Sequence, residues 1–412
     1  MLSAMSSNQQ DKIVEFVDEE TRRDFLPYAL PMIGDEEIAE VVDSLRSGWV
    51  TTGPKTHRFE NELRGYLHAS NVVAVNSCTA GLHIALRALG IGPGDEVIVP
   101  TLTFCATGNV VVQLGAHPVL VDVGNDYNIL PETIEAAITP RTKAVMPVHY
   151  GGQSCDLDAI YAIAVRHNLA VVEDAAHAIG TCYRSMTVGS DAVVPPGLRR
   201  AVAYSFYATK NMTTGEGGAV ATGDAGLAER MRLLTLHGMS RDAWKRYSSS
   251  GSWYYEVLTD GYKCNMTDIQ AAIGIHQLKK LEGFIATRQQ YATKFNEAFR
   301  FLQEVEVPAV HPVGRHTFHL YPLRLNPDRL KISRNVFIEE LRELNIGTSV
   351  HFIPLHWHPF YRETFGYVPG QFPNADALYR NSVSLPLYPA MSEADVSDVI
   401  SAVRRLVARH RK

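Results

Sequence analysis

The sequence lacks the features that define several large protein classes. Its 412 residues contain no uninterrupted apolar run of about 18 residues, so no transmembrane helix and no membrane partner are predicted. The five cysteines stand singly without a CxxC pair, which disfavours both a zinc ribbon and a disulfide framework. Because 39 basic residues are balanced by 44 acidic ones, a nucleic-acid partner is not expected either.

The common catalytic and nucleotide-binding motifs are also missing. The sequence contains no GxxxxGK[ST], no strand-GxGxxG-helix pattern, no HExxH and no GxSxG. The glycine-rich stretch at residues 90–94 follows a helical pattern and precedes a strand, so we interpret it as a turn. ATPase, dehydrogenase, zinc protease and α/β-hydrolase functions are therefore disfavoured.

Residues 21–26 resemble a twin-arginine export signal, but the apolar stretch after them is short. Pro27 and Pro31 interrupt it, and the acidic residues 35–37 follow, so we do not expect export. We predict a cytoplasmic protein with reduced thiols. The polar and charged residues 1–25 are predicted to form a mobile N-terminal arm.

Short β-branched runs alternate with helical patterns over the first two thirds of the chain. The predicted strands are 72–75, 96–99, 119–123, 143–148 and 169–173, and the clearest helices are 79–89 and 157–167. This alternation is typical of an α/β domain with a mainly parallel sheet and helices on both faces. Ligands in such sheets bind at the carboxyl ends of the strands.

The pattern changes beyond residue 267. A helical segment is predicted at 267–301, followed by strands at 317–325 and 347–352 and by helices at 336–344 and 393–409. We predict a large domain over residues 26–280 and a smaller α+β C-terminal domain over residues 281–412.

Three segments carry polar groups at predicted strand ends. Residues 76–80 lie between a strand and a helix, where free N–H groups and hydroxyls favour an anion, although Ser and Thr there also serve as helix caps. Asp174 ends an apolar strand; it could cap the next helix, but a buried carboxylate usually needs a cationic partner. Lys210 follows another strand in a Gly/Thr-rich loop, where a surface lysine is the plain alternative. Together these groups are the set that pyridoxal 5′-phosphate (PLP) requires: a phosphate site, an acid and an amine.

From residue 30 to about residue 407 the chain resembles the DegT/StrS family of sugar-nucleotide aminotransferases. These are PLP enzymes of the aspartate-aminotransferase fold (fold type I), so the resemblance implies that the large domain binds PLP. Lys210 matches the family's Schiff-base lysine, which moves the substrate proton. Asp174 matches the partner of the pyridinium nitrogen, and His177, where many members carry Gln, would lie beside the cofactor's O3′.

The resemblance assigns further contacts to the cofactor. Phe104 matches the aromatic residue that stacks on the ring, although a core phenylalanine is an equally good explanation from the residue alone. Cys78, Thr79 and Ser205 match the phosphate-binding residues. Asn265 matches a residue that touches the phosphate from the other subunit, which implies a homodimer with shared active sites.

Residues 261–265 read GYKCN where many members read GxNYR. This variant, together with residues 349–359 and 384–389, resembles the branch that acts on UDP-linked 4-keto sugars. The resemblance makes Thr51, Lys263 and His351 substrate-binding candidates. His351, His356 and His358 cluster in the sequence, but no carboxylate or cysteine in that stretch completes a ligand set, so no metal is predicted.

The predicted function is PLP-dependent transamination of a nucleotide-linked 4-keto sugar, with UDP as the nucleotide and L-glutamate as the amino donor. Two alternatives remain at this point. One is a PLP-dependent sugar dehydratase, although the related dehydratases carry His at the position of Lys210. The other is a regulatory or binding protein that keeps the fold without catalysis.

Overall fold

The computed structural model describes residues 22–240 and 254–412. Most of the predicted N-terminal arm, residues 1–21, therefore lies outside the described residues. Its described end is held against the C-terminal part of the chain, because Arg22 pairs with both Asp395 and Asp398. The side-chain amide of Asn345 also donates to the backbone carbonyl of Arg22 (2.8 Å).

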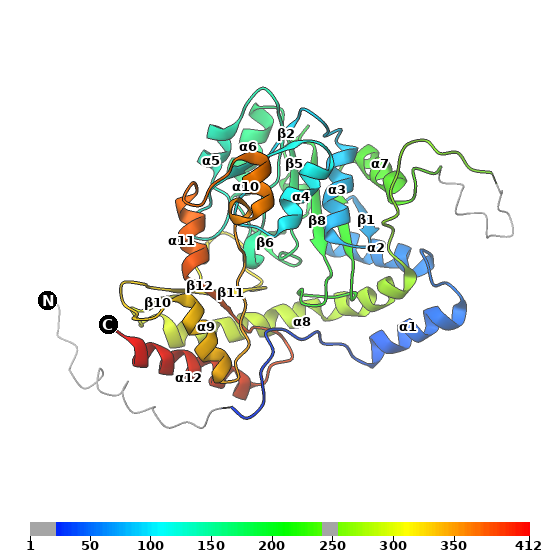
Figure 1. Cartoon of the computed structure of the whole chain (residues 1–412). Coiled ribbons are helices and arrows are strands. Elements are labelled where there is room, and N and C mark those ends of the chain that lie inside the picture. The colour runs from blue at the N-terminus through cyan, green and yellow to red at the C-terminus, as the bar shows by residue number, and fades with distance from the viewer. Residues whose placement is uncertain (1–21, 241–253) are drawn as a thin grey trace.

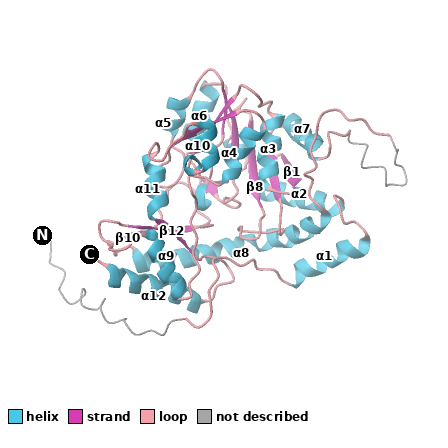
Figure 2. Ribbon diagram, in the orientation of Figure 1, coloured by secondary structure: helices cyan, strands magenta, loops and turns pink. Residues whose placement is uncertain are grey.

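A seven-stranded sheet forms the centre of the large domain (Figures 1 and 2). Its strands are β1 (Asn71–Val75), β2 (Glu96–Pro100), β3 (His117–Val121), β4 (Thr142–Val145), β5 (Ala170–Asp174), β8 (Arg200–Ser205) and β9 (Gly218–Thr222). They lie in the order β1-β9-β8-β5-β4-β2-β3. Strand β9 runs antiparallel to both of its neighbours and the other pairs are parallel, which confirms the predicted, mainly parallel α/β sheet.

Apolar side chains are buried on both faces of the sheet. One face packs against α3 (Cys78–Ala88), α4 (Cys105–Gln113) and α7 (Ala225–Thr235), and the other against α2 (Pro54–Leu67), α5 (Pro131–Ala137), α6 (Leu157–Arg166) and α8 (Asp268–Phe299). Successive residues of a strand point to opposite faces. Val172 of β5 accordingly packs on the first of these faces and Val171 on the other, so the strand is a continuous apolar run.

A second core lies in the C-terminal part of the chain. It is built on a three-stranded sheet of β10 (Val305–Glu306), β11 (Tyr321–Leu325) and β12 (Ser382–Leu385), covered by α9 (Arg334–Glu343) and α12 (Glu393–His410). The helix α8 passes beneath both domains (Figure 1). Its Ile275 and Leu281 pack in the large domain and its Phe295 and Phe299 in the second core, so the boundary predicted at 280/281 falls inside a helix that the two domains share.

The remaining α-helices and strands of the described chain are α1 (Asp35–Ser47), α10 (Pro359–Phe365), α11 (Pro373–Asn381), and the hairpin of β6 (Cys182–Tyr183) and β7 (Met186–Thr187). None of the helices that the structure describes is both long and apolar enough to span a bilayer.

Two predicted strands differ from the structure. The strand predicted at 317–325 begins only at Tyr321, because Phe318 has a φ of 49°, which a strand excludes. The strand predicted at 347–352 is wrong: within it only Ser349 forms a β-bridge, an isolated one with Ser384. After Ser349, the side chains of His351 and Phe352 line a cavity, and Pro354 has no N–H to donate to a neighbouring strand.

Gly218 marks a close approach between β9 and the N-terminus of α3. A Cβ atom there would lie 2.6 Å from the backbone nitrogen of Cys78 and 2.7 Å from the carbonyl oxygen of Tyr204. Both neighbours are backbone atoms, which cannot rotate away. The absence of a side chain at this position therefore sets how closely the helix N-terminus meets the sheet.

We predict that Gly218→Ala lowers the free energy of unfolding by roughly 1–3 kcal/mol, the usual cost of overpacking. Urea unfolding of the cofactor-free protein measures the effect. Gly283→Ala is the matched control, because Gly283 is an exposed residue of α8 with nothing within 4 Å of a Cβ. The control should gain about 0.5–1 kcal/mol from helix propensity. Equal midpoints for the two variants would contradict the close approach.

Candidate active site

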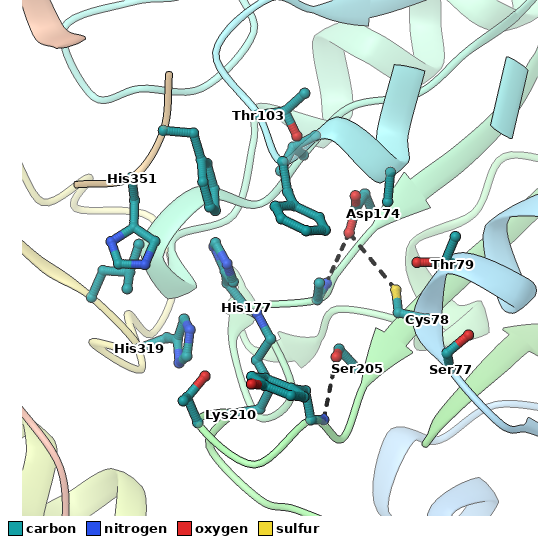
Figure 3. Close-up of a pocket in the computed structure, with 18 of the residues that line it drawn as sticks. Ser77, Cys78, Thr79, Thr103, Asp174, His177, Ser205, Lys210, His319 and His351 are labelled. Atoms are coloured by element: carbon teal, nitrogen blue, oxygen red, sulfur yellow. Dashed lines mark hydrogen bonds between the residues drawn. The ribbon is translucent and has the colours of Figure 1, made fainter. Parts of the chain in front are cut away.

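A cavity of about 410 Å³ lies between the carboxyl ends of the sheet and the second domain. Eight of the residues predicted from the sequence line it: Cys78, Thr79, Phe104, Asp174, His177, Ser205, Lys210 and His351. Figure 3 shows the histidines at one end and Ser77, Cys78 and Thr79 at the other, with Asp174 and Lys210 between them. Side chains that are far apart in the sequence thus face one space.

One end of the cavity is the N-terminus of α3. Ser77 caps the helix, since its hydroxyl accepts a hydrogen bond from the N–H of Ala80 (3.1 Å). The first N–H groups of a helix have no acceptor within it, so those of Cys78 and Thr79 remain available to an anion. The helix dipole adds partial positive charge at this end. Ser77 is therefore the cap that its residue type predicts, and the segment still offers an anion site.

Asp174 ends β5 and is buried, with 4% of its surface exposed. Its carboxylate accepts hydrogen bonds from the N–H of Ala176 (3.1 Å) and from the hydroxyl of Thr107 (2.9 Å). Within residues 22–240 and 254–412 no Lys, Arg or His forms an ion pair with it. Burial raises the pKa of this carboxyl, and the two hydrogen bonds only partly offset that rise.

The thiol of Cys78 lies between the helix N-terminus and this carboxylate. Its sulfur is 4.0 Å from Oδ1 of Asp174. Burial, and after it the charge of Asp174, hold the pKa of the thiol well above its usual range. Cys78 is therefore a protonated, weak donor and not a nucleophile.

Lys210 lies in the loop that joins β8 to β9, and its backbone N–H donates to the carbonyl of Tyr207 (3.0 Å). Burial lowers the pKa of its amine to about 8, although Cys78 and Asp174 act in the opposite direction. A substantial fraction of the amine is therefore neutral near physiological pH. A neutral amine in a cavity is a nucleophile and a base.

Three histidines face Lys210 across the cavity. His177 accepts a hydrogen bond at Nδ1 from the N–H of Gly151 (3.3 Å), so its proton is on Nε2. Its ring centroid lies 4.5 Å from that of His319, whose Nδ1 is 3.2 Å from the side-chain oxygen of Asn211. Burial lowers the pKa of all three imidazoles, that of His351 to about 3, and the charge of Lys210 adds to this effect. These rings are therefore neutral.

Phe104 covers another side of the cavity. It precedes α4, its ring centroid lies 5.8 Å from that of Phe352, and 56% of its surface is exposed. The alternative that Phe104 is a core aromatic is therefore wrong. Its ring is available to stack on a planar ligand.

Three predicted residues do not line this cavity. Asn265 accepts a hydrogen bond from the amine of Lys263 (2.5 Å) and donates to the hydroxyl of Thr52 (2.6 Å). Thr51 precedes Thr52 in the chain, and its carbonyl accepts from the N–H of Asp268 (3.0 Å). Lys263, Asn265 and Thr52 thus form a second polar group, with Thr51 beside it in the chain, and none of these residues lines the cavity of their own chain.

The histidines of residues 351–358 do not converge. His351 hydrogen-bonds at Nδ1 to the hydroxyl of Ser384 (2.9 Å), whereas His356 contacts Thr101 (2.7 Å) and Asp376 (2.8 Å) with its two ring nitrogens. The described part of the chain contains no group of three or more His, Cys, Asp or Glu side chains placed to hold a metal ion.

Among the residues of the site to which sequence reasoning assigned no role are Tyr28, Thr103, Thr107, Arg288 and His319. Thr103 and Thr107 flank Phe104 at helical spacing and bond to each other (2.8 Å), a signal that the sequence offered. Tyr28 lies next to the predicted arm, and Arg288 lies in the middle of a long helix, where an arginine is usually a surface residue. No local pattern distinguishes these two.

Comparisons with known proteins assign the chain to a family. The model of the DegT/DnrJ/EryC1/StrS aminotransferase family matches residues 31–404. The chain belongs to this aminotransferase family. The resemblance predicted for residues 30 to about 407 is thereby confirmed.

Two relatives of known sequence are more than half identical to this aminotransferase. An uncharacterised protein of Methanocaldococcus jannaschii, MJ1066, is 54% identical over 95% of the chain and 100% of its own length. The spore coat polysaccharide biosynthesis protein SpsC of Bacillus subtilis is 53% identical over 94% of the chain and 98% of its own length.

A sugar aminotransferase of Streptococcus pneumoniae, Spr1654, has a similar structure. In its pyridoxamine 5′-phosphate (PMP) form it superposes with a TM-score of 0.86 at 33% identity, covering 93% of this chain and 99% of its own. Its PLP form superposes with a TM-score of 0.85. The predicted aspartate-aminotransferase-like fold is confirmed.

We predict that Lys210 of the cofactor-free protein reacts with acetic anhydride at half its maximal rate near pH 8. The reason is that burial disfavours the charged ammonium, so that the nucleophilic neutral amine appears at a lower pH than the ordinary pKa of 10.5 allows. Mass spectrometry of the Lys210 peptide after short pulses measures the rate. In urea-unfolded protein the same peptide should need a pH near 10.5; superimposable profiles would contradict the prediction.

Proposed function

We propose that this aminotransferase transfers the amino group of L-glutamate to the 4-keto carbon of a UDP-linked sugar and forms the 4-amino sugar. The observation that carries the proposal is that one cavity brings together the Lys210 amine, the buried Asp174 carboxylate and the N-terminus of α3. The family membership supports transamination of a sugar. The UDP-sugar branch rests on the resemblance of residues 261–265, 349–359 and 384–389, and the glutamate donor is an expectation from the resemblance to the family as a whole.

The cofactor is pyridoxal 5′-phosphate, and the residues present fit it. Asp174 is a buried carboxylate without an ion-pair partner among the described residues, which suits a pyridinium nitrogen. The free N–H groups of Cys78 and Thr79 and the hydroxyl of Ser205 suit the phosphate, and the exposed ring of Phe104 suits the pyridine face. When bound, the cofactor supplies an electron sink for the carbanion formed at the substrate carbon.

The chain's own groups handle the proton. Lys210 Nζ takes the proton from the α-carbon of the donor, and its lowered pKa lets it act as a base near neutral pH. The same nitrogen returns a proton to the sugar carbon in the second half-reaction. His177 offers an Nε2–H donor beside Lys210, and the neutral rings of His319 and His351 enclose the site without adding charge.

Thr51, Lys263 and Asn265 support a homodimer with shared active sites. All three lie outside the cavity of their own chain, although the resemblance assigns them contacts with the cofactor phosphate and the substrate. Trp49 and Val50, next to this group, are exposed (42% and 46%). A partner chain that covers these apolar side chains would bring the polar group to its own cavity.

The alternatives carried from the sequence are less well supported. Lys210 stands where the related dehydratases carry His, and a lysine provides the base that transamination needs. Lys210, Asp174 and Ser205 all line the cavity, so the site has not lost the groups that a purely binding protein would no longer require.

A spectroscopic half-reaction tests the proposal. L-glutamate should convert the cofactor absorbance of the purified protein to that of the PMP form, and one UDP-linked 4-keto sugar of a UDP and dTDP panel should reverse the change. The matched control is Lys210→Ala, which keeps the cavity but removes the base, and should show neither the conversion by L-glutamate nor its reversal by the sugar. Reversal by dTDP sugars alone would reject the UDP branch, and no response to glutamate would reject the donor.

Mixed dimers test the shared site. Lys210→Ala removes the base, and Asn265→Asp places a like charge against the cofactor phosphate of the partner, so each homodimer should be impaired. Co-expressed with two tags and purified by both, the pair should regain activity, because one of its two sites contains neither change. Lys210→Ala with Asp174→Ala is the control pair, which should stay inactive since both changes act in their own chain. No recovery in the first pair would contradict shared sites.

A further inference from the structure

Arg288 of α8 is a buried arginine in the wall of the cavity. Only 2% of its surface is exposed. Its Nη1 donates to the backbone carbonyls of His319 (3.4 Å), Phe318 (3.5 Å) and Leu387. Its Nε is buried without a hydrogen-bond partner among the described residues. Part of the guanidinium fork is therefore unsatisfied.

The charge of Arg288 also lacks a counter-ion. Within residues 22–240 and 254–412 no Asp or Glu forms an ion pair with it, and the neighbouring phenol of Tyr28 is neutral because burial raises its pKa. Burial lowers the pKa of the guanidinium to about 10, so it stays protonated at neutral pH. Arg200, the other deeply buried arginine near the sheet, is paired with Glu173 (2.5 Å). An unpaired buried cation is costly, and an anionic ligand removes that cost.

Arg288 lies at the opposite end of the cavity from the α3 N-terminus. Its neighbours there are His319, Leu387 and Tyr28, which belong to the second domain or pack against it. The ring of Tyr28 lies 5.5 Å from that of His351. The cofactor phosphate is proposed to bind at the α3 end, so the anion that meets Arg288 belongs to a substrate.

We propose that Arg288 binds a carboxylate of the amino-acid donor. This inference rests on the proposed transamination and deepens it. A guanidinium recognises a carboxylate with two parallel hydrogen bonds from its N–H groups, and Arg288 brings a guanidinium without an ion-pair partner among the described residues to the wall of the cavity. Arg288 is thus the residue that selects an amino acid as the amine source.

The diphosphate of a nucleotide sugar does not fit the same position. It continues into a nucleoside, so it needs an open groove, whereas Arg288 is 98% buried inside a cavity of about 410 Å³ that also holds the cofactor. The carboxylate of an amino acid is a terminal group and can end at a buried guanidinium. The two substrates share the reacting end of the cavity but place their anions differently.

The test compares Arg288→Gln with Arg334→Gln. Arg334 is a matched control: it is buried (9% exposed), its Nε also lacks a described partner, and its Nη1 donates to a backbone carbonyl, that of Ser382 (3.5 Å). It does not line the cavity. Both variants therefore lose a buried arginine that donates hydrogen bonds to backbone carbonyls. Only Arg288→Gln also loses the proposed carboxylate site.

Half-reactions separate the two substrates. In Arg288→Gln, the apparent Kd of the PLP form for L-glutamate should rise roughly 10- to 100-fold, the value of a charge-assisted hydrogen bond. The same variant loaded directly with PMP should react with the keto sugar as the wild type does. Equal losses in both half-reactions, or an equal loss in Arg334→Gln, would overturn the inference.

Truncated donors identify which carboxylate is bound. L-alanine lacks the distal carboxylate and 4-aminobutyrate lacks the α-carboxylate. If Arg288 binds the α-carboxylate, the substitution slows L-alanine and leaves 4-aminobutyrate unaffected, and the reverse pattern assigns the distal group. If Arg288→Gln changes the rate with neither the truncated donors nor L-glutamate, Arg288 does not bind a donor carboxylate.

A binding measurement does not depend on turnover. Glutarate, an unreactive dicarboxylate, should raise the Tm of the wild-type holoenzyme and of Arg334→Gln, but not that of Arg288→Gln. If glutarate stabilises Arg288→Gln as much as the wild type, the inference fails. If glutarate behaves as expected but L-glutamate leaves the wild-type absorbance unchanged, the carboxylate site stands and the proposed donor chemistry fails.

Discussion

A single buried carboxylate organises the active site. Asp174 is held at the end of β5 by the N–H of Ala176 and the hydroxyl of Thr107, and no described cation pairs with it. Burial without a counter-ion is unfavourable, so this position is stable only because it is hydrogen-bonded and open to a cationic ligand. The cavity, the α3 N-terminus and the loop of Lys210 are all placed around that position. The site is arranged to receive a ring that carries a positive charge.

The sequence predicted the parts of the site that follow from strand ends. Asp174 and Ser205 end apolar runs and Ser77 follows one, so a parallel sheet brings them to one edge, and the structure does so. Lys210 could be predicted because its loop follows β8. The family resemblance then added Phe104, His177 and His351, which line the cavity, and also Thr51, Lys263 and Asn265, which do not.

The rest of the site depends on contacts between distant segments. Arg288 reaches the cavity because α8 passes under both domains, and no local pattern separates it from an arginine on a helix surface. His319 lies in the segment that precedes β11. The alternation of residues predicts a strand there, but the positive φ of Phe318 excludes it, and His319 lies in the cavity wall instead. Tyr28 lies close to residues that the sequence predicts to be mobile. In each case the decisive interaction joins residues that are far apart in the chain.

Strand β5 ends in two adjacent carboxylates with opposite roles. Glu173 points to the face of the large sheet that packs against α6, where the N–H groups of Arg200 and His149 and the hydroxyl of Tyr161 bind it. Although burial raises its pKa, these partners lower it to about 2. Asp174 points into the cavity. Because the side chains of a strand alternate, an insertion of one residue before this pair would move Glu173 to the cavity position, and a deletion would move Asp174 to the position bound by Arg200. The length of the chain before β5 therefore determines which of the two acids faces the cofactor site.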